Sequence, residues 1–204
     1  MIPKTLHTVW IGNKPMCSLN LLCLSSMIHH LPPGWRFVIH GNEEAEEIPW
    51  VSKAMAGGFP STACDYLRIH TLLHEGGIYV DADVEIRKFF DIQSEAFIGF
   101  QREDTIFDSL NTAVCGGVAG HWFFKNLLDR YDQHEPCASQ CFGCTFPTEE
   151  LCAAGMAGVN KTQMVKDVAV YSRDYFHPKD WRDKNINHIT ENTVTIHHFT
   201  GHWA

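Results

Sequence analysis

The sequence has no long apolar run. No stretch reaches the roughly 18 consecutive apolar residues that a membrane-spanning helix needs. We also expect no secretory signal, because the opening MIPKTLHTVWIG enters a predicted core strand at once, with no apolar stretch and cleavage site before it. We therefore expect no transmembrane segment and a cytoplasmic protein, with peripheral membrane contact left open.

Positive charge is also scarce. The chain has 16 Lys and Arg against 24 Asp and Glu, a formal net charge of -8. Nucleic-acid binding normally requires a basic stripe, so we expect no nucleic-acid partner. A small anionic ligand is still compatible with this charge, because a bound metal ion can supply positive charge locally.

The chain contains neither internal repeats nor a low-complexity linker. Its 204 residues, 45% of them hydrophobic, are typical of one globular domain spanning 1–204. Apolar and polar runs alternate in a strand–helix rhythm, which predicts an α/β fold built on a mostly parallel sheet. We expect strands at 5–11, 36–40, 78–80, 97–101, 113–118, 168–171 and 193–199, and helices at 18–31, 61–74 and 121–131. Ser61 is the expected cap of the central helix, and Gly76-Gly77 its end.

Four of the eight cysteines lie close together, with the spacing C-x3-C-x2-C-x7-C: Cys137, Cys141, Cys144 and Cys152. Structural zinc sites usually show two tight cysteine pairs, and this segment shows only part of that pattern. We expect free thiols in a loop and helix, and a zinc site remains the alternative.

The main chemical signal is the run Gly76-Gly77-Ile78-Tyr79-Val80-Asp81-Ala82-Asp83. Two acids follow a short buried strand, at the sheet edge where ligands bind in open α/β folds. Residues two apart in an extended segment point the same way, so we expect Asp81 and Asp83 to converge on one position. Paired carboxylates suit Mg²⁺ or Mn²⁺. The alternative is a polar turn with no ligand.

A charged pair precedes this strand. Asp65 and Arg68 are three residues apart on the predicted helix and therefore share a face. They are either an exposed ion pair of little energetic value or a polar site close to the two acids. The apolar positions around them favour the second interpretation.

The run CDYLRIHTLLHEGGIYVDADVE, residues 64–85, resembles the signature of the glycosyltransferase sugar-binding region containing DXD motif. The opening IPKTLHTVWIG resembles that family's first strand, and HHFTGHW near the end resembles its closing motif. More distantly, the arrangement is similar to that of the large clostridial glucosylating toxins. The resemblance implies a GT-A type, Rossmann-like fold, with a mostly parallel central sheet flanked by helices.

The resemblance also implies residue roles. It implies donor contacts from Trp10, Asp65, Arg68, Tyr79, Asp81 and Trp203. Asp83 and His198 would hold Mn²⁺ or Mg²⁺, with Asp81 acting mainly through the ion's water shell. His197 and His198 face opposite sides of a strand, so at most one should reach the metal, and the resemblance favours His198.

Two positions depart from the family pattern. Cys64 stands where relatives usually have Ser, and Gly201 stands where many have Ser. A phosphate contact is therefore either absent or made by Thr200 or His202.

The implied activity is transfer of a hexose from a UDP- or GDP-sugar to an unknown acceptor, such as a glycan or polysaccharide. Asp65, Arg68, Asp81 and Asp83 are the candidate catalytic residues. The resemblance implies retention at the anomeric carbon. Two alternatives stay open: a non-catalytic nucleotide-sugar-binding module, and a phosphohydrolase of the haloacid-dehalogenase type. Glu85 counts against the phosphohydrolase, whose motif normally has Thr or Val at that place.

Overall fold

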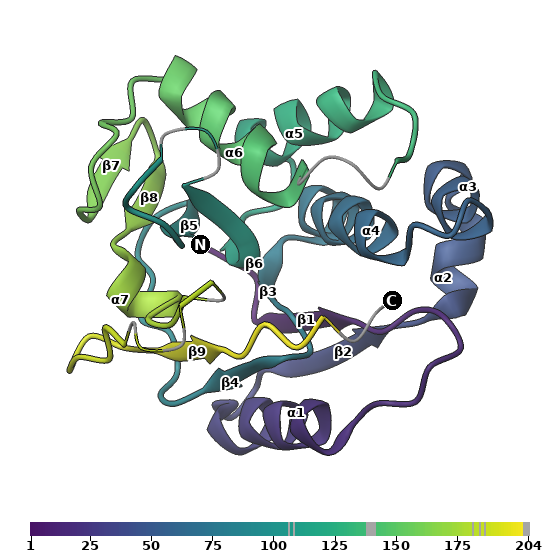
Figure 1. Ribbon diagram of the computed structural model, residues 1–204, viewed down its shortest axis with the longest axis horizontal. Helices are drawn as coiled ribbons and strands as arrows, with labels where there is room; N and C mark the ends of the chain where they lie inside the picture. The colour runs from purple at the N-terminus through teal and green to yellow at the C-terminus, as the bar shows by residue number, and fades with distance from the viewer. Residues whose placement is uncertain are drawn as a thin grey trace.

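The computed structural model describes residues 1–105, 107, 109–137, 142–180, 182–183, 185 and 187–201. Figure 1 shows the elements of this part of the chain arranged around one large sheet. In chain order they are β1 (Thr5–Val9), α1 (Ser18–His30), β2 (Arg36–His40), α2 (Asn42–Glu47), α3 (Pro49–Ala56), α4 (Pro60–Glu75), β3 (Gly77–Val80), β4 (Val84–Ile86), β5 (Ala96–Phe100), β6 (Leu110–Gly117), α5 (Trp122–Asp132), α6 (Phe142–Ala153), β7 (Gln163–Val165), β8 (Val168–Tyr171), α7 (Arg173–Phe176) and β9 (Thr195–His197).

The large sheet has the strand order β2-β1-β3-β6-β5-β8-β7. Strands β1, β2, β3, β5 and β8 run in one direction, and β6 and β7 run against them. The predicted α/β fold with a mostly parallel sheet is therefore confirmed. Strand β1 lies between β2 and β3, so the carboxyl ends of these three strands meet at one edge.

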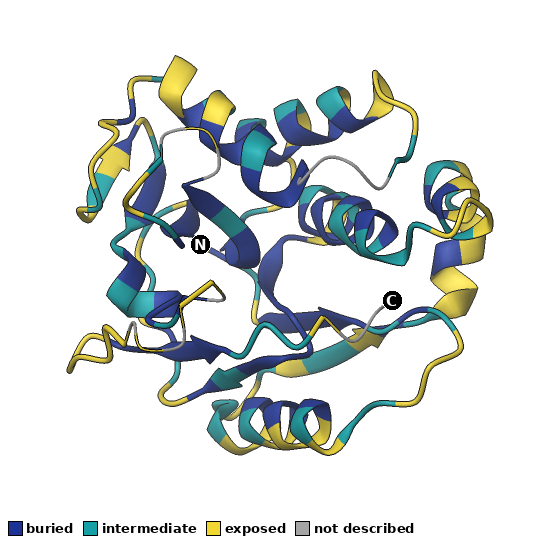
Figure 2. Ribbon diagram, viewed as in Figure 1, coloured by how far each residue is buried: buried dark blue, intermediate teal, exposed yellow. Residues whose placement is uncertain are grey.

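The two faces of the sheet are buried in different cores. Figure 2 shows the central strands β3 and β6 mostly in dark blue, as buried. On β3, Tyr79 packs into the core shared with α4, α5 and α6, while Ile78 and Val80 pack into the core that includes Met27 of α1. This alternation follows from the two-residue period of a strand. Figure 1 shows α4, α5 and α6 together on one side and α1 on the other, so the predicted flanking helices are present.

Helix α4 begins one residue earlier than expected. Pro60 is its first residue, and Phe59 precedes it without a side-chain cap. Ser61 therefore lies inside the helix, so the predicted capping role is wrong; the fixed φ of proline at the first helical position starts the helix instead. The predicted end is confirmed, because Gly76 follows α4 with φ 66° and a Cβ there would lie 2.6 Å from the amide nitrogen of Ala119.

A second, two-stranded sheet pairs β4 with β9. The register places Val84 opposite His197 and Ile86 opposite Thr195. The sequence predicted the later strand over a longer range and gave no strand for β4. This antiparallel ribbon brings the end of the described chain next to the DXD turn.

Cys152 is an exposed free thiol, Cys144 is buried and Cys137 is partly buried, and Cys141 lies outside the described residues. Among the described residues no cysteine belongs to a group that could hold a metal ion. A search of the same residues finds no helix both long and apolar enough to cross a bilayer.

Candidate functional site

The two aspartates of the DXD sequence lie in a turn. Strand β3 ends at Val80, the amide of Asp81 donates to Ala113 of β6 at 2.8 Å, and the amide of Val84 donates to the carbonyl of Asp81 at 2.9 Å. The extended geometry expected for this segment is therefore wrong. The convergence itself is confirmed, because one ligand atom from each of Asp81, Asp83 and His197 lies within 4.8 Å of the others.

Arg68 connects helix α4 to this turn. Its Nη2 lies 3.0 Å from Asp65 Oδ1 and 3.0 Å from Asp81 Oδ1, and its Nη1 donates to Thr112 Oγ1 at 3.1 Å. Arg68 is only 5% exposed, so the exposed-pair interpretation is wrong. Its guanidinium carbon also lies 4.8 Å from the centre of the Tyr79 ring. One buried cation therefore joins two carboxylates. Removing these charges from water costs free energy, so such an arrangement is more expected at a binding site than elsewhere.

Asp65 is held in a tight space beside the start of α6. Burial raises the pKa of Asp65 to about 6, while the charge of Arg68 and a hydrogen bond from the backbone of Gly143 act in the opposite direction. A Cβ on Gly143 would lie 2.8 Å from Asp65 Oδ1 and 2.9 Å from Thr112 Oγ1. Glycine at position 143 therefore lets α6 approach this carboxylate closely.

Asp83 is 1% exposed and is surrounded by the segment after β9. Its Oδ2 accepts hydrogen bonds from the amide of Thr200 at 2.8 Å and from Thr200 Oγ1 at 3.1 Å, and its Oδ1 lies 3.3 Å from His197 Nε2. Burial alone would raise the pKa of Asp83, but His197 and the Thr200 hydrogen bonds hold that pKa well below its usual range. The carboxylate is therefore ionised and ready to accept a cation.

The structure places His197, not His198, beside Asp83. His198 Nε2 instead lies 3.1 Å from Glu85 Oε2. The expectation that His198 is the histidine next to the acids is therefore not met, because the register that pairs Val84 with His197 turns the neighbouring side chain away. The argument that only one of the two histidines can face the acids agrees with this geometry.

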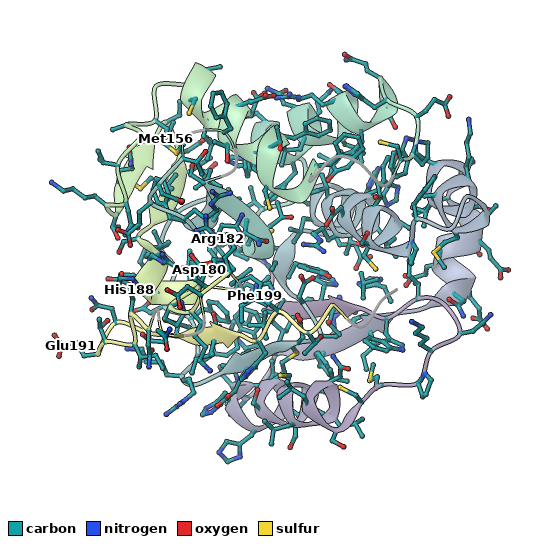
Figure 3. All side chains as sticks on the ribbon, viewed as in Figure 1. Met156, Asp180, Arg182, His188, Glu191 and Phe199 are labelled. Atoms are coloured by element: carbon teal, nitrogen blue, oxygen red, sulfur yellow. The ribbon has the colours of Figure 1, made fainter. Side chains whose placement is uncertain are left out.

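Phe199, labelled in Figure 3, helps to fix the orientation of His197. The two rings stack with their centres 3.8 Å apart and an interplanar angle of 23°. Phe199 adopts a φ of 51°, which is unfavourable for a bulky residue and occurs mostly where surrounding structure or function imposes it. This turn of the backbone is what brings Thr200 onto Asp83.

Several buried polar atoms in this cluster lack a partner. Within the described residues, neither Asp83 Oδ1 nor either ring nitrogen of His197 has a hydrogen-bond partner, apart from the 3.3 Å ion-pair contact between Asp83 Oδ1 and His197 Nε2. Buried polar groups are rarely left unpaired, and an imidazole with two carboxylates is a donor set that a divalent cation satisfies. The residues present therefore fit a metal ion at Asp81, Asp83 and His197.

A second group of possible ligands, Glu95, His121 and Asp167, does not fit a metal ion. The amide of Phe123 donates to His121 Nδ1 at 3.2 Å, so a neutral ring carries its proton on Nε2, the nitrogen that faces Asp167. Asp167 also accepts a hydrogen bond from the indole of Trp122 at 2.6 Å. This group is better described as a contact that holds Asp167 against α5.

The other predicted donor-binding residues differ in how they are placed. Trp10 follows β1 at the sheet edge that carries Asp81, is partly buried, and donates its indole N–H to the carbonyl of Lys14 at 3.0 Å. Tyr79 is fully buried and donates its hydroxyl to Asp81 Oδ1 at 2.7 Å, so it supports the aspartate. Trp203 and His202 lie outside the described residues.

Sequence reasoning missed four residues of this site: Thr112, Gly143, His177 and His197 as the partner of Asp83. His177 is fully buried, its ring centre lies 5.5 Å from that of His197, and neither of its ring nitrogens has a hydrogen-bond partner among the described residues. No local pattern marks these positions. Only the excess of histidines near the end of the chain gave a signal for His197.

Comparison with known proteins agrees with this geometry. Residues 22–98 match the family model described as "Glycosyltransferase sugar-binding region containing DXD motif". No curated protein matches the chain. The solved structure of PaToxG Glycosyltransferase is similar with a TM-score of 0.57 and 20% identity, over 74% of this chain and 68% of that one. A glycosyltransferase involved in glycosylation of the major capsid of PBCV-1 is similar with a TM-score of 0.50 and 11% identity, over 97% of this chain and 95% of that one.

At these identities the two structures show a shared fold, which is that of GT-A type glycosyltransferases. The family match spans α4, β3 and the DXD turn, the elements that carry Asp65, Arg68, Asp81 and Asp83. The match of residues 22–98 to this family model and the shared fold together indicate a glycosyltransferase.

Proposed function

We propose that this protein is a metal-dependent glycosyltransferase that moves a hexose from a UDP- or GDP-sugar to a glycan acceptor, as one GT-A domain over 1–204. The observation that carries the proposal is the convergence of possible ligand atoms from Asp81, Asp83 and His197, beside the buried Arg68. A cation site next to a buried polar pair suits a nucleotide diphosphate joined to a sugar.

Asp83 and His197 are the residues that would hold the ion directly. Asp81 Oδ1 already accepts from Tyr79 and pairs with Arg68, so this carboxylate acts mainly through the ion's water shell. A histidine among the ligands favours Mn²⁺ over Mg²⁺. When bound, the ion supplies positive charge that stabilises the leaving diphosphate.

Arg68 and Asp65 would hold and orient the donor sugar, because their polar groups lie together at the edge of the sheet beside the DXD turn. Their fixed geometry supplies the proximity that transfer needs. Trp10 would stack on the base from the end of β1, and Tyr79 would support Asp81 from beneath. A contact from Trp203 to the diphosphate, and a metal contact from His198, stay predictions.

We propose that transfer proceeds with retention. Asp65 and Asp81 are both paired with Arg68, and Asp83 is bonded to Thr200, so each carboxylate is already committed to another group. None is free to act as a glycosyl nucleophile, which favours attack on the same face as the departing diphosphate. Proton NMR of the anomeric position in the first-formed product tests this, and an inverted configuration would refute it.

The test of the activity measures nucleoside diphosphate release from a panel of UDP- and GDP-sugars with Mn²⁺. We expect slow hydrolysis of one donor, lost after EDTA treatment and in Asp83→Asn. Asp129→Asn is the matched control, because Asp129 is an exposed acid of α5 that pairs only with the exposed Lys125 among the described residues. It should keep full release.

Other outcomes identify the alternatives. Thermal stabilisation by one donor without release, even with a broad set of acceptors, would indicate a non-catalytic nucleotide-sugar-binding module. Turnover of an aryl phosphate that is insensitive to nucleotide-sugars would indicate the phosphohydrolase. Either result would overturn the proposed transfer.

A further inference from the structure

A cavity of about 330 Å³ lies beside α7, next to the end of the ribbon where Ile86 pairs with Thr195. The segment after β4 forms one wall, β8 and α7 form another, and the residues before β9 close the third. Its lining residues are Lys88, Phe89, Phe90, Asp91, Ile92, Tyr171, Tyr175, Phe176, Asn192 and Val194. The volume is at the lower end of the range for small-molecule sites and suits one small ligand.

Aromatic rings form the walls and floor of this cavity. Phe90 and Phe176 are buried beneath it with ring centres 5.9 Å apart, and the rings of Tyr171 and Tyr175 are 4.9 Å apart and partly exposed. Phe89 is also partly exposed. Flat aromatic faces left accessible inside a hollow are good partners for the C–H face of a sugar ring, which is apolar in the same plane.

Polar groups surround the aromatic floor. Neither the Tyr171 nor the Tyr175 hydroxyl has a hydrogen-bond partner within the part of the chain that the structure describes. Lys88 and Asp91, both exposed, bring opposite charges to the same rim, where Lys88 also donates to the Glu191 carbonyl and Asp91 accepts from Gln93. Asn192 lines the cavity as well, and its amide N–H donates to Asp174 Oδ2 at 3.1 Å. Because the charges of Lys88 and Asp91 cancel, these donors and acceptors suit a neutral polyol. A phosphate would need net positive charge, and a lipid chain would leave the polar groups without partners.

The cavity and the metal cluster lie at opposite ends of the same ribbon. Lys88 and Val194 flank the end of the ribbon where Ile86 pairs with Thr195, whereas Asp83 and His197 lie at the other end. Three residues of extended chain span roughly 10 Å, so the cavity is separate from the donor site but within the length of a short oligosaccharide. The loop beside it ends in Glu191, at the outer tip of the molecule in Figure 3.

We propose that this cavity binds a neutral pyranose unit of a saccharide, at a site separate from the DXD centre. Binding follows from the cavity alone. Its use as a distal subsite for the acceptor rests on the proposed function. Saccharide binding at the cavity and transfer at the DXD centre can be tested independently, because binding at the cavity can be measured with no metal ion and no nucleotide present.

The experiment is saturation-transfer-difference NMR on the full chain without metal. The probes are the methyl glycosides of glucose, galactose, mannose and N-acetylglucosamine at millimolar concentration. We expect transfer to at least one glycoside, reduced at least about fivefold in Tyr175→Ala and unchanged in Asp83→Asn. Tyr175→Phe, which keeps the ring but removes the hydroxyl, should reduce transfer less than Tyr175→Ala.

Leu21→Ala is the matched control, because it removes an exposed apolar side chain from α1, a helix that contributes no residue to the cavity lining. It should leave transfer unchanged. Thermal unfolding monitored by circular dichroism identifies any Tyr175 variant that does not fold. If Tyr175→Ala does not fold, the proposal is tested by comparing Tyr175→Phe with the unaltered protein. The proposal is overturned if no glycoside shows transfer, if transfer persists in Tyr175→Ala, or if only an apolar probe such as octanol binds.

Discussion

Arg68→Met is the most informative substitution, because it removes the one cation that the structure places between Asp65 and Asp81. Methionine keeps most of the side-chain volume and loses both pairs and the hydrogen bond to Thr112. Breaking a buried ion pair by removing one partner typically costs about 3–5 kcal/mol, because the other charge stays buried and unpaired. With a urea dependence near 2 kcal/mol per molar, the unfolding midpoint should fall by about 2 M.

The loss should depend on pH. Burial raises the pKa of Asp65 to about 6 even with Arg68 present, and removal of the guanidinium raises it further. A carboxylate whose folded-state pKa is raised destabilises the fold above that pKa, and this penalty disappears as pH falls toward the unfolded-state value near 4. The stability difference between Arg68→Met and the unaltered protein should therefore be larger at pH 7.5 than at pH 5.

Urea unfolding followed by tryptophan fluorescence at both pH values measures this effect. Adding Asp65→Asn to Arg68→Met should recover stability at pH 7.5, since the second change removes an unpaired charge. Arg87→Met is the control, because its side chain is 55% exposed and its pair with Glu85 is long, so it should cost less than about 1 kcal/mol. Equal costs for the two arginine variants, or a loss that is independent of pH, would refute the reasoning.

Three further predictions concern positions around the site. Gly143→Ala should destabilise the protein by about 1–3 kcal/mol and weaken donor binding, because the new Cβ would clash with Asp65 and Thr112. Gly41→Ala is the control, since a Cβ there would have no atom within 4 Å, and it should change neither property. Urea unfolding and donor titration measure the two effects. Burial lowers the pKa of His7 from its usual value near 6.5 to about 4. As the pH falls, the unfolded chain is therefore protonated at this position before the folded protein, so the free energy of unfolding should rise with pH between about 4 and 6.5, by up to about 3 kcal/mol. His7→Gln should flatten that rise in pH-dependent unfolding. Mn²⁺ should raise the thermal unfolding midpoint and EDTA should reverse the effect, and a rise of equal size in Asp83→Asn would count against the metal site.

The sequence predicted the strands of the sheet well where apolar runs are bounded by turn residues. Strand β2 and strand β8 have the predicted bounds, and Gly76 ends α4 as expected. Strand β4 was missed because three residues after a DXD turn have no period of their own. Its extended form depends on pairing with β9, more than a hundred residues later in the chain.

The candidate site was predictable where its residues are close together in the sequence, and not where distant elements meet. Asp65 and Arg68 share a helix face, and Asp81 follows a buried strand, so local spacing predicts their closeness. The contacts of Arg68 with Thr112, and of Asp65 with Gly143, join elements that are distant in sequence. No local pattern of residue types encodes such contacts, because they follow from the packing of α4 and α6 against β6.

The identity of the histidine beside Asp83 depends on the register between β4 and β9. A strand places His197 and His198 on opposite sides, and a slip of one residue between β4 and β9 would exchange them. The observed register is fixed at both ends, where Arg87 donates to the carbonyl of Val194 and His198 donates through its amide to the carbonyl of Asp83. Thr195 Oγ1 also donates to the carbonyl of Phe176, which ties β9 to α7. These three hydrogen bonds, two between backbone groups and one from a side chain, therefore decide which imidazole faces the DXD aspartates, and no local sequence pattern encodes them.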